Sequence, residues 1–476
     1  MAWLGRTRRV HFVGIGGIGM SGIAELLTNL GYEVSGSDAK RSDITDRLAT
    51  MGVRIDAGHA AANVERADVV VVSSAIKADN PEVMEARKRH VPVIARAEML
   101  AELMRLRFGI AIAGAHGKTT TTSMVALMLE RAGLDPTAVI GGRLSAFGSN
   151  ARLGQGQYMV AEADESDRSF LKLSPSIAVV TNIDREHLES YGSSFDSAQD
   201  RFESLVDAFA DFAGRVPFYG AVIACVDDPA VAGMIGRLER RVVTYGFAEH
   251  ANVRGLDAWS DGRSARCKVE YAIHGLPGGS GEGQLTLAVP GLHNLQNSLA
   301  AVAVGLELGV PFEKIASALG EFKGAERRYQ LRGAERGVTV VDDYGHHPTE
   351  IAAVLRAARS GHPRRLVAVF QPHRYSRTRD LLGEFGPALA LADVVFLTDI
   401  YAAGEAPIAG AMLGDLADNV RRSVAALHVV AALDDVPGAV ASESRDGDLV
   451  VTLGAGSIGT TGDRILQTIA QGGSRG

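Results

Sequence analysis

The chain reads FGIAIAGAHGKTTTTSMVALMLERAG over residues 108–133. The first six residues are apolar or small, which predicts a buried β-strand over Phe108–Ala113, because the inner strands of a parallel sheet are covered on both faces. A glycine-rich segment follows and leads into a helical pattern that Gly133 ends. A strand, a glycine loop and a helix in this order predict a phosphate-binding loop in a parallel α/β sheet.

The loop also carries the side chains that phosphate chemistry needs. Its backbone amides would surround the β- and γ-phosphates of ATP, Lys118 would reach the γ-phosphate, and the Thr119 hydroxyl would bind Mg²⁺. The full Walker pattern has a glycine where Ile112 stands. The alternative is a glycine turn before a surface helix, and the run Gly-Lys-Thr-Thr at a strand-to-helix junction argues against it. The residues expected to bind ATP here are Gly114, Ala115, His116, Gly117, Lys118, Thr119 and Thr120.

Polar residues follow the next two predicted strands. Glu162–Asp167 come after the strand Tyr158–Ala161, and the segment 181–187, with the sequence TNIDREH, ends the strand Ile177–Asn182. Carboxylates at the carboxyl end of a strand beside a phosphate loop are typical Mg²⁺ ligands. A solvated acidic loop and a structural histidine are the alternatives. Because two neighbouring strand ends carry polar groups, we expect both to face the phosphate loop.

A second glycine motif lies near the N-terminus. Gly14–Gly19, with the sequence GIGGIG, separates a predicted strand, Arg9–Val13, from a predicted helix, Ile18–Leu30, and Asp38 stands where a ribose-binding acid belongs. The pattern indicates a diphosphate rather than a nicotinamide, although an NAD-dependent oxidoreductase stays open as an alternative. A copy at Gly454–Gly459 has only 17 residues after it, so the pattern alone is weak.

The last third of the chain has two further polar strand ends. Gly345–Pro348 follow a pair of aspartates, and Gln371–Arg377 follow the predicted strand Leu366–Phe370. A zinc site at the paired histidines is disfavoured, because no third ligand stands at metal spacing. Arg374 and Arg377 suit recognition of a small carboxylate or phosphate.

Length and composition set the outer limits. The 476 residues suggest about three domains, and 46% hydrophobic residues with a net charge of -7 indicate a soluble enzyme without a broad nucleic-acid surface. Two cysteines are too few for a disulfide framework, and no apolar run is long enough for membrane insertion. We expect a cytoplasmic enzyme with domains at 1–107, 108–330 and 331–476. The glycine-rich stretch Ala251–Gln284 is expected to be irregular strands and loops on the central domain.

Together these segments resemble the Mur ligases over about residues 9–459, in the order of that family. The motifs that carry the resemblance are the two glycine loops, EADESD at 162–167, TNIDREH at 181–187, His293-Asn294 with Asn297, Arg327-Arg328-Tyr329, DDYGHHP at 342–348 and FQPHRY at 370–375. The resemblance implies an α/β fold of three domains: a Rossmann-like UDP-binding domain, a central P-loop ATPase-type parallel sheet, and a Rossmann-like C-terminal domain that closes over the substrates and brings the amino acid.

The resemblance also implies an activity, ATP-dependent amide-bond formation on UDP-N-acetylmuramate through an acyl phosphate, for peptidoglycan synthesis. The segments 162–170 and 371–377 look more like the family member that adds L-alanine than the one that adds a whole murein peptide, which is the alternative. Small-molecule substrates are the expected partners, and a monomer or weak homodimer the expected assembly.

By matching positions, the resemblance assigns further residues. Expected UDP-substrate contacts are Gly14, Gly16, Gly17, Ile18, Gly19, Ser37, Asp38 and Ser74. Expected ATP contacts outside the loop are His293, Asn294, Arg328 and Asp343, and the expected metal ligands are Thr119, Glu162 and His187. Expected amino-acid contacts are His347, His373, Arg374 and Arg377, and the residues expected to act in catalysis are Lys118, His187, Arg374 and Arg377.

The chain departs from the family pattern in two places, with Ala115 where threonine is usual and Glu186 where aspartate often precedes the histidine. Several Mur ligases that add later residues use a carbamylated lysine downstream of the metal-binding histidine. This chain has no lysine between Lys172 and Lys268. Arginine stays protonated and cannot take up carbon dioxide in that way, so we predict that no carbamate forms.

Overall fold

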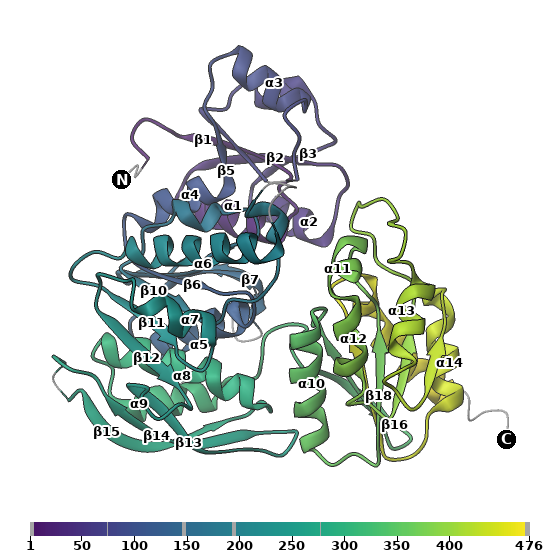
Figure 1. Cartoon of the computed structure of the whole chain (residues 1–476). Helices are drawn as coiled ribbons and strands as arrows, with labels where there is room; N and C mark the ends of the chain where they lie inside the picture. Colours follow the sequence, from purple (N-terminus) through teal and green to yellow (C-terminus); the bar gives the residue numbers. More distant parts are fainter. Residues whose placement is uncertain (1–3, 74, 145–148, 193–196, 277, 472–476) are drawn as a thin grey trace. The chain divides into compact units, whose positions relative to one another are not determined.

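The computed structural model describes residues 4–73, 75–144, 149–192, 197–276 and 278–471. They form three β-sheets with helices packed on them (Figure 1), which confirms the predicted α/β class. The chain divides into two compact units, the first of Met1–Leu256, Lys268–Leu285 and Gln296–Glu321, the second of Asp257–Cys267, Thr286–Leu295 and Phe322–Gly476. Among the described helices, none has both the length and the apolar character needed to cross a bilayer.

The first sheet has five parallel strands in the order β3-β2-β1-β4-β5. Its elements are β1 (Arg9–Val13), α1 (Ile18–Asn29), β2 (Glu33–Asp38), α2 (Asp43–Thr50), β3 (Arg54–Ala57), β4 (Val69–Val72), α3 (Pro81–Lys88), β5 (Val93–Ala95) and α4 (Arg96–Met104). The strand order reverses beside β1, between β2 and β4. The loop after β1 therefore lies where open α/β sheets bind their ligands.

The second sheet has ten strands in the order β15-β14-β13-β12-β11-β10-β6-β9-β7-β8. Its strands are β6 (Phe108–Ala113), β7 (Thr137–Leu144), β8 (Ser149–Arg152), β9 (Tyr158–Glu162), β10 (Ile177–Val180), β11 (Ala221–Cys225), β12 (Val242–Gly246), β13 (Val253–Ser260), β14 (Ala265–Ala272) and β15 (Ser280–Leu287). The helices that follow in this part are α5 (Lys118–Arg131), α6 (Ala198–Gly214), α7 (Pro229–Ile235), α8 (Leu292–Glu307) and α9 (Phe312–Gly320). β6 lies between β10 and β9, so both strands followed by polar motifs flank the strand before the phosphate loop.

The stretch Ala251–Gln284 is more regular than the sequence suggested. It contributes three strands of eight residues each, β13 to β15. In β14 every second residue, Ala265, Cys267 and Val269, is buried, which is the alternation of a sheet with one covered face. The glycines that suggested irregular structure include Gly275 and Gly278, which have positive φ between β14 and β15. The expected strands are therefore present, but the expectation that they would be irregular was wrong.

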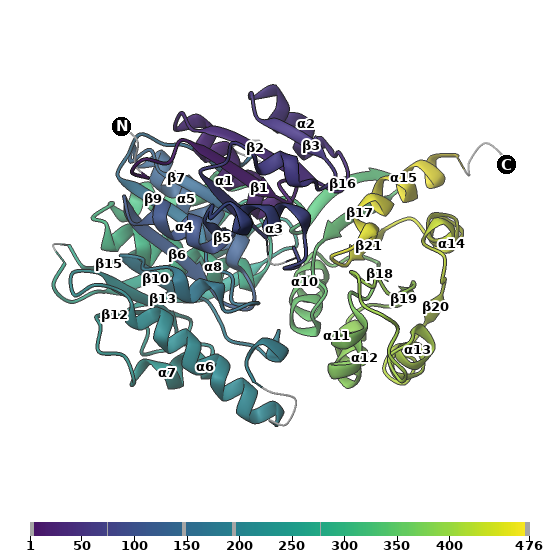
Figure 2. The ribbon, with the colours of Figure 1, turned by 90° about the horizontal axis from the view of Figure 1, so that it is seen from above.

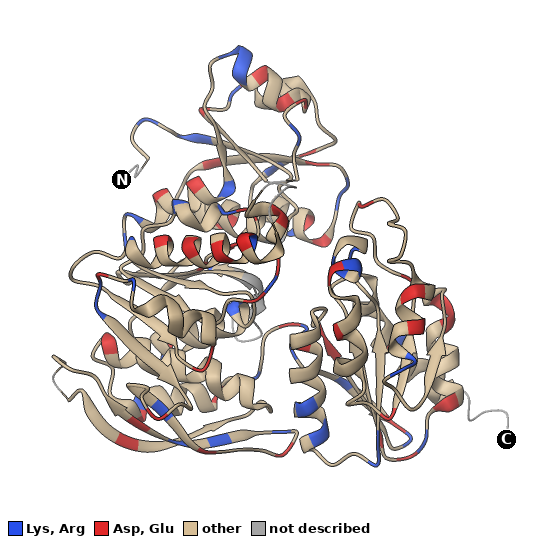
Figure 3. Ribbon diagram, viewed as in Figure 1, with Lys and Arg blue, Asp and Glu red and all other residues tan. Residues whose placement is uncertain are grey.

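Helix α6 is amphipathic. Leu205, Phe209 and Phe212 are buried in the core of the first unit, at the spacing of one helical face. The opposite face is exposed and acidic, as the red segments of this helix in Figure 3 show. Its four acidic residues are Asp200, Glu203, Asp207 and Asp211.

The third sheet lies in the second unit and has the order β16-β17-β21-β18-β19-β20, with only β16 antiparallel to its neighbour. Its elements are β16 (Gln330–Glu335), β17 (Val338–Asp343), α10 (Pro348–Ser360), β18 (Arg365–Phe370), α11 (Tyr375–Asp380), α12 (Leu382–Leu389), β19 (Val394–Leu397), α13 (Leu413–Val420), β20 (Leu427–Val429), α14 (Val436–Glu443), β21 (Asp448–Leu453) and α15 (Thr461–Gln471). In β18, Leu366 and Phe370 pack with α10 and α12, whereas Val367 and Val369 pack with α14 and α15. Helices cover both faces (Figure 2), which explains the continuous apolar runs of these strands.

Candidate nucleotide-binding site

The loop between β6 and α5, residues 114–117, is held by the end of the neighbouring strand β10. The Asn182 side chain accepts a hydrogen bond from the His116 amide at 2.8 Å and donates to the His116 carbonyl at 3.0 Å. The Thr181 hydroxyl donates to the same carbonyl at 2.7 Å. These bonds confirm that the motif after β10 faces the phosphate loop, and they fix the loop backbone.

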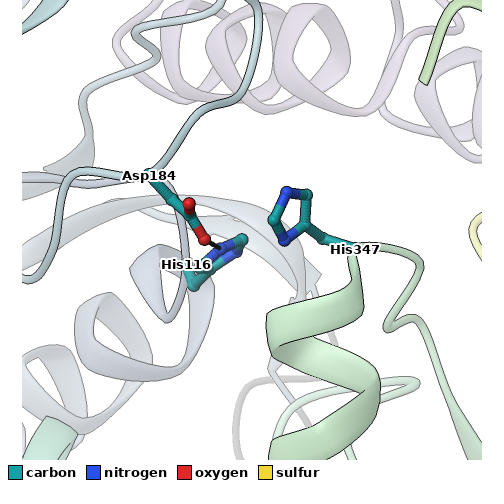
Figure 4. Close-up of side chains that lie close together, drawn as sticks. All are labelled: His116, Asp184 and His347. Atoms are coloured by element: carbon teal, nitrogen blue, oxygen red, sulfur yellow. Dashed lines mark hydrogen bonds and ion pairs between the residues drawn. The ribbon is translucent and has the colours of Figure 1, made fainter. Parts of the chain in front are cut away.

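The His116 side chain also points toward that motif. Its Nε2 lies 2.8 Å from the Asp184 carboxylate (Figure 4). His347, also drawn there, belongs to the second unit and caps helix α10, where its Nδ1 accepts a hydrogen bond from the Thr349 amide at 3.3 Å. The histidine expected only as part of the loop therefore forms a hydrogen bond to Asp184 that further ties the segment after β10 to the loop.

Gly117 begins helix α5 in the left-handed region, at φ 81°. A Cβ at this position would lie 2.6 Å from Oδ1 of Asn297, a nearly buried side chain on α8. Glycine is required here for both its backbone angle and its close approach to Asn297.

Lys118 folds back onto the loop and meets a carboxylate. Its ammonium donates to the Gly114 carbonyl at 2.5 Å and lies 2.8 and 2.9 Å from the two oxygens of Glu165, which is buried. Burial disfavours the charged lysine, but the carboxylates of Glu165 and Asp164 outweigh it and raise the pKa of Lys118. The lysine therefore stays protonated. Sequence reasoning did not single out Glu165, because the pair spans 47 positions of the chain.

Glu162 and His187 lie on the strand ends that flank β6. Glu162 ends β9 and pairs in register with Ile112, two residues before the loop. His187 follows β10 in a left-handed conformation, at φ 55°, with its side chain partly exposed. Thr119 stands in the first turn of α5 and is also partly exposed. All three expected metal ligands are thus on elements that meet at the carboxyl edge of this sheet.

The acidic loop after β9, residues 163–168, also contacts the N-terminal sheet region. Asp164 lies 3.4 Å from the guanidinium of Arg96, the first residue of α4. The same guanidinium packs on the N-terminal glycine loop, since a Cβ at Gly19 would lie 2.9 Å from it. Arg96 belongs to none of the sequence motifs, so its position beside the loop could not be predicted from the sequence.

The N-terminal glycine loop, residues 14–19, is held by the end of β2. The amides of Gly14 and Ile15 donate to the Ser37 carbonyl at 2.8 and 3.0 Å, and the Gly16 amide donates to the Asp38 carboxylate at 2.9 Å. Asp38 therefore organises this loop, in addition to any ligand contact. Gly17 precedes α1 as its N-cap. Two further expected contacts, Ser74 and the side chain of Ile18, lie outside the part of the chain that the structure describes.

Ser37 has a structural partner that the sequence did not suggest. Its hydroxyl is fully buried and donates to Glu82 at 2.6 Å. Burial disfavours the Glu82 carboxylate, but the nearby His11 side chain and hydrogen bonds from Ser37 and Asn63 outweigh it and lower the pKa of Glu82 to about 2. His59 also contacts this pair, at 3.0 Å from Ser37 and 3.2 Å from Glu82. The side chain of Ser37 therefore forms a hydrogen bond inside the protein, next to the first sheet.

In the second unit, Asp343 ends β17 in a buried position. Its carboxylate accepts hydrogen bonds from the amides of Tyr329 and Gly345 at 2.7 and 2.6 Å. Burial raises the pKa of Asp343 to about 6, although the charge of Arg328 opposes this shift. His293 has its pKa lowered to about 4 by burial and by the same arginine, and is neutral at pH 7. The Asn294 side chain donates to the Pro290 carbonyl at 2.6 Å.

The segment after β18 forms a second polar cluster. Arg377 donates to Nδ1 of His373 at 3.0 Å, and Arg374 lies 3.9 Å from Glu405. The Glu405 carboxylate accepts hydrogen bonds from the amide and hydroxyl of Ser376 at 3.0 and 2.6 Å. The two arginines are thus on one short segment but have different partners. Glu405, on the loop after β19, was not expected.

The third glycine motif, residues 454–459, has packing roles. The Gly454 carbonyl accepts a hydrogen bond from Arg327 at 2.6 Å, and the Ile458 amide donates to Gln371 at 3.0 Å. A Cβ at Gly459 would lie 2.5 Å from the Arg327 guanidinium. These close contacts explain the glycines without any ligand.

Known proteins match the chain along most of its length. Three models of Mur ligase domains match successive segments: the Mur ligase family catalytic domain at residues 9–108, the Mur ligase middle domain at 112–305, and the glutamate ligase domain of Mur ligases at 327–456.

Full-length relatives agree with these segments. A UDP-N-acetylmuramate–L-alanine ligase of Pelobacter propionicus is 52% identical over 464 residues, which cover 97% of this chain and 98% of the relative. One from Geobacter sulfurreducens is 51% identical and covers 98% and 99%. The crystal structure of a UDP-N-acetylmuramate–alanine ligase from Thermotoga maritima superimposes with a TM-score of 0.80 at 28% identity, covering 98% of this chain and 99% of that one. With three domain models in the family's order and relatives matched from end to end, the chain belongs to the Mur ligase family.

Proposed function

We propose that this chain joins L-alanine to the lactoyl carboxylate of UDP-N-acetylmuramate, with conversion of ATP to ADP and phosphate, in the cytoplasmic synthesis of peptidoglycan precursors. The observation that carries the proposal is the loop at 114–120, with a protonated Lys118 and a backbone held by Asn182 and Thr181. The names of relatives at 51–52% identity support the choice of substrates.

The reaction needs two transfers. The substrate carboxylate attacks the γ-phosphorus of ATP, which gives an acyl phosphate and ADP. The amine of alanine then attacks the acyl carbon, and phosphate leaves. Lys118 stabilises the charge that develops on the phosphoryl oxygens during the first transfer, since a fixed cation in a partly buried site acts more strongly there than in water.

A magnesium site fits the residues at the carboxyl edge of the second sheet. Glu162 and Thr119 offer the oxygen ligands that Mg²⁺ prefers, and His187 offers a weaker nitrogen ligand. Bound there, Mg²⁺ would neutralise charge on the phosphates of ATP. The register of Glu162 with Ile112 supports this assignment, because it puts the carboxylate at the base of the loop.

The remaining contacts follow the sequence assignment. The proposed UDP contacts are the loop Gly14–Gly19 with Ser37, Asp38 and Ser74, where Ser37 is now expected to act through its backbone. His293, Asn294, Arg328 and Asp343 are proposed to contact ATP, and His347, His373, Arg374 and Arg377 the amino acid.

A single assay tests the proposal. Phosphate release is measured with UDP-N-acetylmuramate crossed against L-alanine, glycine, L-serine and a murein tripeptide. Release is expected only when ATP, the nucleotide sugar and L-alanine are present together, or with glycine or serine at lower efficiency. Release driven by the tripeptide instead of alanine would establish the peptide-adding activity. Release without either acceptor would indicate a nucleotide-binding ATPase.

A further inference from the structure

Asp164 and Glu165 are consecutive residues of the acidic loop, but they bind cations that belong to different glycine loops. Glu165 pairs with Lys118 of the ATP loop, and Asp164 pairs with Arg96, which packs on Gly19 of the N-terminal loop. All of these residues lie in the first unit. Each carboxylate is therefore linked to one of the two glycine loops by the cation that it binds.

The contact of Glu165 with Lys118 is close and shielded from solvent. The Glu165 side chain is 3% exposed, and both of its oxygens are within 2.9 Å of the ammonium. A lysine side chain has four rotatable bonds, so this pairing and the bond to the Gly114 carbonyl restrict where the charge sits. Restricting the position of a cation in advance lowers the entropic cost of bringing it to the transition state.

The contact of Asp164 with Arg96 is looser, at 3.4 Å, and both side chains are partly exposed. The carboxylate is itself oriented, because its other oxygen accepts a hydrogen bond from the Ser166 amide at 3.1 Å. A guanidinium held over the start of α1 adds positive charge where the helix N-terminus already favours an anion.

The segment that carries the two carboxylates is anchored on both sides. The Ala163 amide donates to the Ile112 carbonyl at 2.9 Å. The Tyr191 hydroxyl donates to the Glu165 carbonyl, and the Ser190 hydroxyl donates to the Ser166 carbonyl at 2.7 Å. With its backbone fixed to β6 and to the segment after His187, the loop can set the positions of both cations.

We infer that Asp164 and Glu165 are positioning residues, Asp164 for Arg96 at the UDP-sugar loop and Glu165 for Lys118 at the ATP loop. The inference rests on the proposed function for the identity of the two ligands. Each carboxylate hydrogen-bonds one of the two cations, and Asp164 reaches Lys118 only through its longer-range charge. Neutralising each carboxylate is therefore expected to change mainly a different parameter. A role in folding alone would change both ligands together.

The test compares Glu165→Gln with Asp164→Asn in the full-length enzyme. For Glu165→Gln, kcat is expected to fall about 10-fold or more while the Kd of the ATP analogue AMP-PNP stays within about 3-fold, because a misplaced lysine weakens the transition state more than the ground state. For Asp164→Asn, the Kd of UDP-N-acetylmuramate is expected to rise about 5-fold, with kcat at saturation and the AMP-PNP Kd within about 2-fold. Calorimetry gives both Kd values without turnover.

Asp167→Asn is the matched control, since Asp167 is an exposed carboxylate of the same loop that accepts a hydrogen bond from the Ser169 amide. It should leave all three parameters unchanged. If a neutral variant fails to fold, Glu165→Asp and Asp164→Glu keep the charge and should move the same parameter by a smaller factor.

Equal changes in both ligands for either variant, or an unchanged kcat in Glu165→Gln, would overturn the inference. A parent enzyme that neither binds UDP-N-acetylmuramate nor needs L-alanine for phosphate release would instead overturn the proposed function. The two failures are thus distinguishable.

Discussion

The two glycine loops of the first unit are built by the same device and differ in where their positive charge comes from. In each, the loop after one strand is held by the end of a neighbouring strand: Ser37 and Asp38 hold residues 14–16, and Thr181 and Asn182 hold residues 115–116. The second loop contains its own cation, Lys118. The first contains none and meets Arg96 from helix α4.

This difference separates two parts of phosphate recognition. Glycines and a helix N-terminus let a phosphate approach the backbone, and they serve binding. A lysine inside the loop can stay in contact with a phosphoryl group while the charge of that group changes during transfer. Such a contact contributes to the reaction as well as to binding. The third motif, Gly454–Gly459, also meets an arginine from outside, Arg327, but this residue donates to the Gly454 carbonyl, and the contacts with Arg327 and Gln371 explain the glycines by packing. The glycine pattern therefore predicts only that another group comes close to the backbone. The residues around the motif indicate whether that group is a phosphate or a side chain of the protein.

The largest expected effect comes from removing the cation of the second loop. Lys118→Ala should lower kcat by about 10³-fold or more, because it removes a charge that the phosphoryl transition state uses most. Single-turnover phosphate release measures the loss, and thermal unfolding checks that the fold is intact. Turnover within a few-fold of the parent would show that the second loop only binds and that the contrast between the loops is false.

A second prediction concerns the glycine that opens helix α5. In Gly117→Ala the new Cβ would lie 2.6 Å from Asn297 Oδ1, at a φ of 81°. The loop must shift, so the affinity for ATP is expected to fall about 10- to 100-fold. Gly133→Ala is the matched control, since it has φ +82° with no atom within 4 Å of the new Cβ. It carries the same backbone strain without the contact. Equal ATP affinities in the two variants would show that the contact with Asn297 does not matter.

Local patterns predicted the parts of the site that are contiguous in sequence. The strands Arg9–Val13 and Phe108–Ala113 were predicted with the bounds observed, because a glycine loop directly follows each of them. The pairs Lys118–Glu165 and Arg96–Asp164 span 47 and 68 positions. No local pattern encodes them, because they depend on which strands are neighbours in the sheet. For the same reason Ser37 was expected only as a ligand contact, while its hydroxyl bonds to Glu82.

The next prediction concerns the first loop. Asp38→Ala removes the acceptor of the Gly16 amide, so the Kd of UDP-N-acetylmuramate should rise about 10-fold, the usual loss for one charge-assisted hydrogen bond. The Kd of AMP-PNP should not change, because that ligand is assigned to the other loop. Asp46→Ala on α2, an exposed carboxylate, is the control. An equal loss of affinity for UDP-N-acetylmuramate and AMP-PNP, measured by calorimetry, would show that the two loops do not bind separate ligands.

A smaller effect is expected at His187. If its imidazole is one weak ligand among oxygen ligands, His187→Ala should raise the Mg²⁺ concentration for half-maximal turnover several-fold and leave saturated kcat less affected. His90→Ala is a suitable control, because His90 is an exposed histidine in the same left-handed conformation, at φ 56°. An unaltered Mg²⁺ titration would assign His187 a purely structural role.

The smallest expected effect is none at all. Removing or adding bicarbonate should leave activity unchanged, because a carbamate needs a lysine that can lose its proton. The chain has no lysine between Lys172 and Lys268. Helix α6, the first helix of more than one turn after His187, instead presents an exposed acidic face of Asp200, Glu203, Asp207 and Asp211.

Lys118 directly precedes Thr119, one of the proposed metal ligands, and it is unsuited to carbamylation. Its pKa is raised by Glu165 and Asp164 despite its burial, so the neutral amine that reacts with carbon dioxide is scarce at neutral pH. Assays in degassed buffer with and without added bicarbonate decide the point. Stimulation that persists at constant pH and ionic strength would mean that a lysine from outside the loop motif reaches the site and acts there as an anionic carbamate.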